Sequence, residues 1–150
     1  MHPRPLFAAL LATALLAACA TPSRPVRPFG DELAGCIKAT GQSQAYLLDV
    51  PAPNNAVSTQ MAIATLEMGG SSSVDELVWL LKGAQVKALA VTGASDALTA
   101  ATLRTALGRL PARTDPVATS VCFAGDARYA ADLRTAAQRA GVPIFFTAAP

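Results

Sequence analysis

The amino-acid sequence predicts a small α/β sandwich in which about four mostly parallel strands are flanked by helices. Short apolar runs alternate with helical segments along residues 31–150, separated by glycine, proline or capping residues. This alternation is typical of parallel βαβ units, whose right-handed crossovers place the helices on the faces of the sheet. The chain has 150 residues, 52% of them hydrophobic, which suits a single folded domain and excludes a disordered chain.

The first part of this domain is predicted to hold one helix and one strand. Asp31–Ala39 is expected to form a short helix, because acidic residues stand in its first turn. Gln44–Val50 is an apolar run that ends just before Pro51 and Pro53, which favours a strand.

Residues 56–68 fit two structures. Helical spacing relates four of their apolar residues, namely Val57, Met61, Ala64 and Met68. Apolar residues also stand at every second position, as is typical of a strand, namely Ala62, Ala64, Leu66 and Met68. Both possibilities stay open for this segment.

A clearer helix is expected after Ser73. Ser73 and Glu76 have the spacing of a capping box, in which the serine caps an amide and the glutamate reaches back. The apolar residues that follow form one stripe, made of Val74, Leu77, Val78 and Leu81. Gly83 is expected to end this helix.

The second half of the domain repeats the strand and helix rhythm. The expected elements are a strand at Val86–Val91, a helix at Ala97–Leu110, a strand at Thr119–Ala124, a helix from Gly125 to a stop at Gly141, and a strand at Pro143–Thr147. Residues 103–106 and 133–136 share the sequence LRTA, and a glycine ends each preceding strand. Alanine-rich helices give such matches by chance, so a duplication stays open.

The N-terminus has the pattern of a secretory signal. Residues 1–18 carry Arg4 in a short head, followed by an apolar stretch from Leu6 to Ala18. That stretch is shorter than the ~20 residues a membrane-spanning helix needs, and it matches the length of a signal-peptide core.

The end of the stretch, Leu16-Ala17-Ala18-Cys19, resembles the lipobox of bacterial lipoproteins. The resemblance implies cleavage before Cys19 and a lipid anchor on that residue, made of fatty acyl groups such as palmitate. Ala20 follows the cysteine where inner-membrane lipoproteins carry an aspartate, which implies the periplasmic face of the outer membrane. Residues 19–30 then form the acylated cysteine and a proline-rich tether that reaches roughly 30 Å.

The charge balance argues against nucleic acid as a partner. The chain carries 12 Lys/Arg and 10 Asp/Glu, and removal of residues 1–18 takes away only Arg4. Without the tether arginines, Arg24 and Arg27, the domain has 9 basic against 10 acidic side chains. A nucleic-acid binder needs a basic surface, and DNA and RNA are unexpected in the periplasm.

The two remaining cysteines are a candidate disulfide. Cys36 and Cys122 form an even pair in an oxidising compartment, although two separate buried thiols are the alternative. No CxxC motif is present, which argues against a redox dithiol or a zinc ribbon.

Catalytic groups are scarce. The single histidine, His2, lies in the predicted signal peptide, so the mature chain would hold none. Triad hydrolases, Cys-His proteases and histidine-ligated metal sites all need an imidazole. The adjacent acidic pairs, Asp31-Glu32 and Asp75-Glu76, stand at helix starts where the helix dipole explains them. We therefore predict a protein that is not an enzyme, with no catalytic residue, cofactor or metal.

Two places are candidates for binding. Ligands of parallel sheets bind beyond the carboxyl ends of the strands, where free helix amides can hold an anion, although helix capping explains the same residues. The residues there are Thr92, Gly93, Ser95, Asp96, Gly125, Asp126 and Arg128. Trp79 lies off the apolar stripe of its helix, so it is a candidate partner contact, with burial by a second neighbour as the alternative.

The sequence therefore favours a lipid-anchored lipoprotein that binds an envelope protein or a secretion assembly. One alternative is a module that binds a small ligand at the strand ends. Another is a periplasmic immunity protein that neutralises a toxic effector. Membrane contact through the N-terminal lipid is common to all three.

Overall fold

The structure is a computed structural model that describes residues 29–83 and 86–147 of the 150-residue chain. The predicted signal peptide and residues 19–28 of the predicted tether lie outside the described residues. The α-helices are α1 (Phe29–Thr40), α2 (Ala56–Met68), α3 (Ser72–Gly83), α4 (Asp96–Arg109) and α5 (Ala130–Ala140). The strands are β1 (Tyr46–Val50), β2 (Ala88–Gly93), β3 (Ser120–Ala124) and β4 (Ile144–Thr147).

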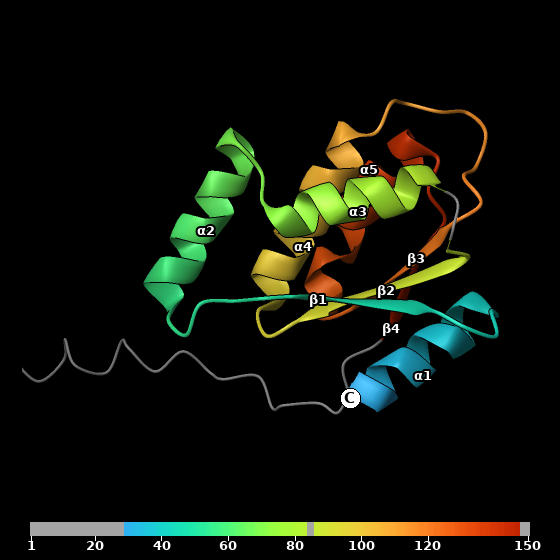
Figure 1. Cartoon of the computed structure of the whole chain (residues 1–150), viewed down its shortest axis with the longest axis horizontal. Helices are drawn as coiled ribbons and strands as arrows, with labels where there is room; N and C mark the ends of the chain where they lie inside the picture. The colour runs from blue at the N-terminus through green and yellow to red at the C-terminus, as the bar shows by residue number, and fades with distance from the viewer. Residues whose placement is uncertain (1–28, 84–85, 148–150) are drawn as a thin grey trace, which may run out of the picture.

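The four strands form one parallel sheet in the order β1-β2-β3-β4, which confirms the predicted α/β class. Each crossover moves the chain by one strand in the same direction. Helices α3, α4 and α5 lie on one face of this sheet, and α1 lies on the other (Figure 1). Helix α2 packs on α4 and stands at one end of the domain (Figure 1).

The main core lies between the sheet and its helical face. Large side chains of the two central strands point into it, namely Leu89, Val91, Val121 and Phe123. The stripe of α3 and the inner face of α4 cover them, as the helical periodicity predicts. Both faces of β2 are buried along its whole length, because helices cover both sides of the sheet there.

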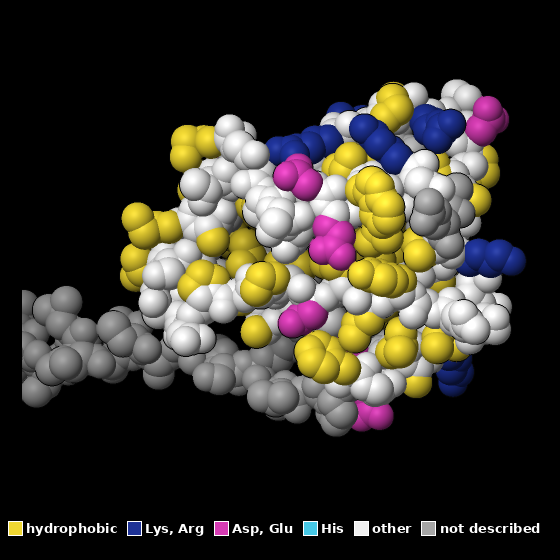
Figure 2. Space-filling view, viewed as in Figure 1, with side chains coloured by type: hydrophobic (Ala, Val, Ile, Leu, Met, Phe, Trp, Pro, Cys, Tyr) yellow, Lys and Arg dark blue, Asp and Glu magenta, His cyan; other side chains and the backbone are white. Residues whose placement is uncertain are grey.

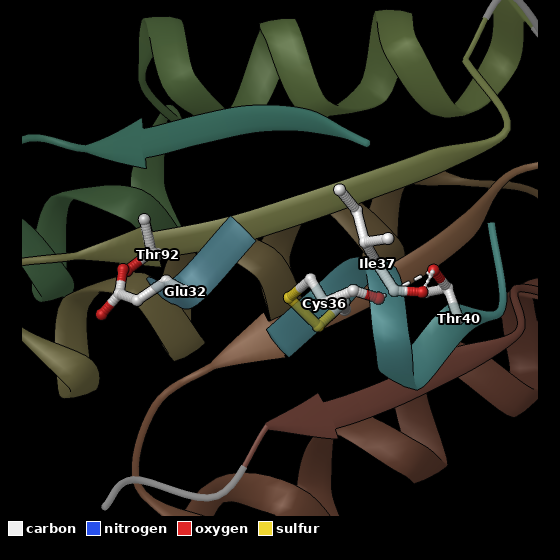
Figure 3. The surroundings of a disulfide bond; sticks show 6 residues. Glu32, Cys36, Ile37, Thr40 and Thr92 are labelled. Atoms are coloured by element: carbon white, nitrogen blue, oxygen red, sulfur yellow. Dashed lines mark hydrogen bonds between the residues drawn. A yellow bond between two sulfur atoms is a disulfide. The ribbon is translucent and has the colours of Figure 1, made fainter. Parts of the chain in front are cut away.

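The second face is packed with small side chains. Ala90, Ala124 and the two cysteines form a separate buried cluster beneath α1. Cys36 of α1 and Cys122 of β3 are joined by a disulfide, with their Cα atoms 5.6 Å apart (Figure 3). The predicted pairing is thus confirmed, and it fastens the one helix that covers this face of the described sheet.

Several expected boundaries shift. Residues 56–68 are helical, so the open choice between helix and strand is resolved. The predicted capping box at Ser73 is wrong, because the helix begins at Ser72 and the cap lies two residues before the predicted one, where the Ser71 hydroxyl accepts a hydrogen bond from the Val74 amide at 3.4 Å. Three successive serines offer equivalent caps, and the sequence alone does not rank them.

Of the two predicted boundaries of the last helix, the start shifts and the end is as predicted. The segment after Gly125 opens with a single 3-10 turn (Ala127–Tyr129), and the α-helix starts only at Ala130. Gly141 adopts a left-handed conformation with φ of 66° and ends α5, as predicted. Within the described residues, no helix combines the length and the apolar character that crossing a bilayer requires.

Candidate functional site

The turns that follow β2 and β3 lie side by side at the carboxyl edge of the sheet. Ser95 caps α4, where its hydroxyl oxygen accepts a hydrogen bond from the Leu98 amide at 3.3 Å. Asp96 reaches across to the next turn, and its Oδ2 accepts a hydrogen bond from the Asp126 amide at 3.2 Å. The structure therefore brings Asp96, Gly125, Asp126 and Arg128 together, as the parallel strands predict.

The chain's own side chains engage this edge. Asp126 accepts hydrogen bonds from the backbone amide and from Nε of Arg128, both at 2.8 Å, and pairs with a guanidinium nitrogen at 2.6 Å. Hydrogen bonding to Arg128 lowers the pKa of Asp126 below its usual value. Arg128 also lies over the ring of Tyr129, 5.5 Å from its centroid. The guanidinium of Arg128, the cation of the predicted anion site, thus already has a partner within the chain.

The strand order also bears on the small-ligand alternative. Open α/β sheets form their ligand crevice where the strand order reverses and adjacent connections leave on opposite faces. Here the order runs β1-β2-β3-β4 without reversal. Gly93 packs so closely on β1 that a Cβ atom there would lie 2.7 Å from the Val50 carbonyl oxygen. Binding at these turns stays a prediction, and the fold supplies no crevice of that kind for it.

Thr92 belongs to a different group on the α1 face. Its side chain is buried, and its hydroxyl donates a short hydrogen bond to the carboxylate of Glu32 (Figure 3). Glu32 lies one turn before Cys36 on α1, so the disulfide and this bond hold the same face of the helix on the sheet. Glu32 is also buried, a role that its place in the first turn of a helix does not predict.

Asp49 lies beside this group, because it pairs with Thr92 in the register of β1 and β2. Partial burial raises the pKa of Asp49, and the nearby charge of Glu32 raises it further. Two carboxylates therefore approach one another at the end of the sheet. Asp49 itself is exposed.

We expect Asp49→Asn to stabilise the protein at pH 7. A raised pKa means that folding disfavours the ionised carboxylate, so its cost is full above the folded pKa and vanishes below the ordinary value of 3.8. Urea unfolding of both proteins should show the gain at pH 7 and none once the pH falls below about 3.8. A variant that is less stable at pH 7 would show instead that the Asp49 carboxylate makes a favourable contact.

A groove of about 270 Å³ lies on the helical side of the domain. Its floor is the small-residue face of α4, and α2 and α5 form its walls. The polar lining residues are Gln60, Arg104, Tyr129 and Asp132. Typical ligand pockets measure roughly 300–1,000 Å³, so the volume of this groove falls just below that range.

Four of the six large apolar side chains that are exposed among the described residues lie on α2 and α3. On α3, Trp79 is 60% exposed, so it is outside the core. Glu76, one turn before it, accepts a hydrogen bond from the hydroxyl of Tyr46 at 3.3 Å. We call Trp79, Glu76 and Tyr46 the Trp79 surface. On α2, the side chains of Val57, Met61 and Met68 are also exposed. Figure 2 shows hydrophobic side chains at the surface over both helices.

No known protein family, characterised protein or solved structure matches this chain.

Some contacts of the candidate sites could not be predicted from the sequence pattern. The bond between Glu32 and Thr92 joins residues 60 positions apart, and it depends on which face of the sheet α1 covers. The exposure of Trp79 agrees with its position off the apolar stripe, whereas the exposed side of α2 could not be chosen from its spacing. Among the described residues, no cluster of three or more His, Cys, Asp or Glu side chains is placed to hold a metal ion.

Proposed function

We propose that this chain is a bacterial lipoprotein, held by acylated Cys19 on the periplasmic face of the outer membrane, whose α/β domain binds an envelope or secretion protein without catalysing a reaction. The observation that carries the binding role is the exposure of Trp79. Tryptophan contributes more binding energy than most residues when a partner buries it, and an exposed tryptophan leaves a large apolar surface in water.

The sequence supports the anchor. Leu16-Ala17-Ala18-Cys19 ends an apolar stretch of signal-peptide length, and it resembles a lipobox. The proposed tether enters the domain at Phe29, the first residue of α1. Because Glu32 of α1 contacts Thr92 near the end of β2, the tether joins at the carboxyl edge of the sheet.

The Trp79 surface lies toward the opposite edge. Tyr46 is the first residue of β1, and Trp79 is in the last turns of α3, the helix that leads back to the start of β2. A five-residue strand spans roughly 16 Å, so this surface is separated from the point where the tether enters. A membrane-anchored domain would therefore present the Trp79 surface to soluble partners.

Crosslinking in the intact envelope tests this proposal. We expect the wild-type chain to crosslink to a protein partner and the Trp79→Ser chain to lose this crosslink. The affinity for the partner should fall at least ~30-fold, as for a residue that contributes about 2 kcal/mol to binding. Trp79→Phe is the matched control and should retain most of the crosslink. Cys19→Ser should move the chain from the membrane to the soluble fraction.

Different results count against different parts. A wild-type chain that captures no protein would overturn the binding role, and so would a Trp79→Ser chain that crosslinks as well as wild type. A Cys19→Ser chain that stays in the membrane fraction would overturn the lipid anchor. The free energy of unfolding of Trp79→Ser should lie within about 0.5 kcal/mol of the wild-type value, because the side chain is exposed. A lost crosslink would therefore not reflect unfolding.

A further inference from the structure

We propose that two copies of this chain pair through the outer face of α2, with their α2 helices antiparallel. The outer face consists of Val57, Met61, Ala64 and Met68, which we call the α2 stripe. All four are exposed, with Val57 at 71%, Met61 at 68% and Met68 at 80%. This inference concerns a different surface from Trp79, and it does not depend on the proposed function.

The α2 stripe is a second apolar face on a helix that already has one. At 100° per residue its four members lie within about 60° of one another, and Leu66, the buried residue of α2, lies opposite them. Leu66 faces α4, which is the packing partner of this helix. A helix that is apolar on both sides is expected to be covered on both sides. Figure 2 shows hydrophobic side chains along the outer edge of α2.

The order of residues in the stripe fits a second copy of itself. A two-fold axis between residues 62 and 63 places Val57 against Met68 of the other copy, and Met61 against Ala64. Each contact then joins a smaller side chain to a methionine, which allows the two surfaces to interdigitate. The stripe spans about 16 Å along the helix.

The polar flanks match in the same register. On one side, Gln60 lies close to Glu67 of the second copy, so an amide donor meets a carboxylate and like charges are kept apart. Glu67 is also held loosely by Arg104 of its own chain, at 3.9 Å. On the other side, the Thr65 hydroxyl already donates to the Met61 carbonyl at 2.6 Å, so it needs no partner there.

A lipid surface fits the same stripe less well. Helices that lie in a membrane interface usually carry Lys and Arg on their polar side, where these residues meet anionic headgroups. The sequence of α2 holds no Lys or Arg, and its one charged residue is Glu67. The charge of the helix therefore favours a protein surface, and its internal symmetry favours another copy of this chain.

The contact is small, so the dimer is expected to be weak in dilute solution. A three-turn helix pair buries less than the roughly 800 Å² per partner of a standard interface. We expect the full-length chain in detergent to form a dimer at high concentration, as measured by sedimentation equilibrium. Met61→Glu should weaken the dimer about 100-fold or more, because it removes two buried methionines and adds charge. Met61→Leu is the matched control and should retain the dimer.

A charge pair tests the antiparallel register. Ala64→Lys alone should also weaken the dimer, whereas a mixture of Met61→Glu and Ala64→Lys chains should form a heterodimer. A parallel pair would place residue 61 against residue 61 and give no such rescue. A wild-type chain that stays monomeric up to about 1 mM would overturn the proposal. Binding of that monomer to lipid vesicles through the α2 stripe would assign the stripe to a membrane surface instead. A dimer that survives Met61→Glu, or an unrescued mixture, would overturn the proposal equally.

Discussion

Replacing both Cys36 and Cys122 with alanine is expected to lower the free energy of unfolding by about 4 kcal/mol. The disulfide joins residues 86 positions apart, so it removes a large amount of conformational freedom from the unfolded chain. A loss of this size is a large fraction of the ~5–15 kcal/mol that stabilises a typical domain. Urea unfolding of the double variant beside the oxidised wild type measures it.

The loss should be greatest around α1. This helix lies alone on its face of the described sheet, over small side chains that bury little apolar area. Without the disulfide, we expect the amides of α1 to exchange with solvent faster than those of α4. A reducing agent should lower the free energy of unfolding of the wild type by about as much as the double substitution does, and it should leave that of the double alanine variant unchanged. Equal free energies of unfolding for the wild type and the double alanine variant under oxidising conditions would contradict this role for the disulfide.

The central part of the fold could be predicted from sequence because its signals are local. Continuous apolar runs around Leu89 and Val121 reflect strands that are covered on both faces. Ser95 and Gly141 mark helix ends through the chemistry of capping and the left-handed conformation. These features depend on a few neighbouring residues, so the strand and helix order emerged from them.

The rest depends on contacts that local patterns do not encode. The spacing of Met61 and Met68 fits a helix but leaves a strand open, and it does not show which side of the helix faces α4. Glu32 has the same first-turn position as any acidic helix residue, and only the placement of α1 brings it to Thr92. The parallel strands predict that the strand-end residues Asp96 and Asp126 lie together. The hydrogen bond from the Asp126 amide to the Asp96 carboxylate has no local signal, because it needs the two turns to be at a particular distance.

Phe123→Ala is expected to destabilise the domain by about 3–5 kcal/mol. Phe123 is fully buried near the carboxyl end of β3, and its ring meets Phe146 of β4 edge to face at 6.3 Å between centroids. Truncation leaves a cavity that the rigid sheet cannot close. Phe123→Leu is the control, and it should cost markedly less because it keeps most of the volume. Thermal and urea unfolding measure both, and a loss under 1 kcal/mol for alanine would contradict a central role for this ring.

The same ring explains why the strand-end turn contains Gly125. A Cβ atom at that position would lie 2.5 Å from Cζ of Phe123 and 3.1 Å from Oδ1 of Asp96. Gly125→Ala should therefore cost about 1–3 kcal/mol in the wild-type background. In a Phe123→Ala background the aromatic clash is absent, so the same change should cost less than half as much. A double-mutant cycle with purely additive losses would show that Gly125 is needed for another reason, whereas strong coupling ties the Asp96–Asp126 turn to the core through a single aromatic side chain.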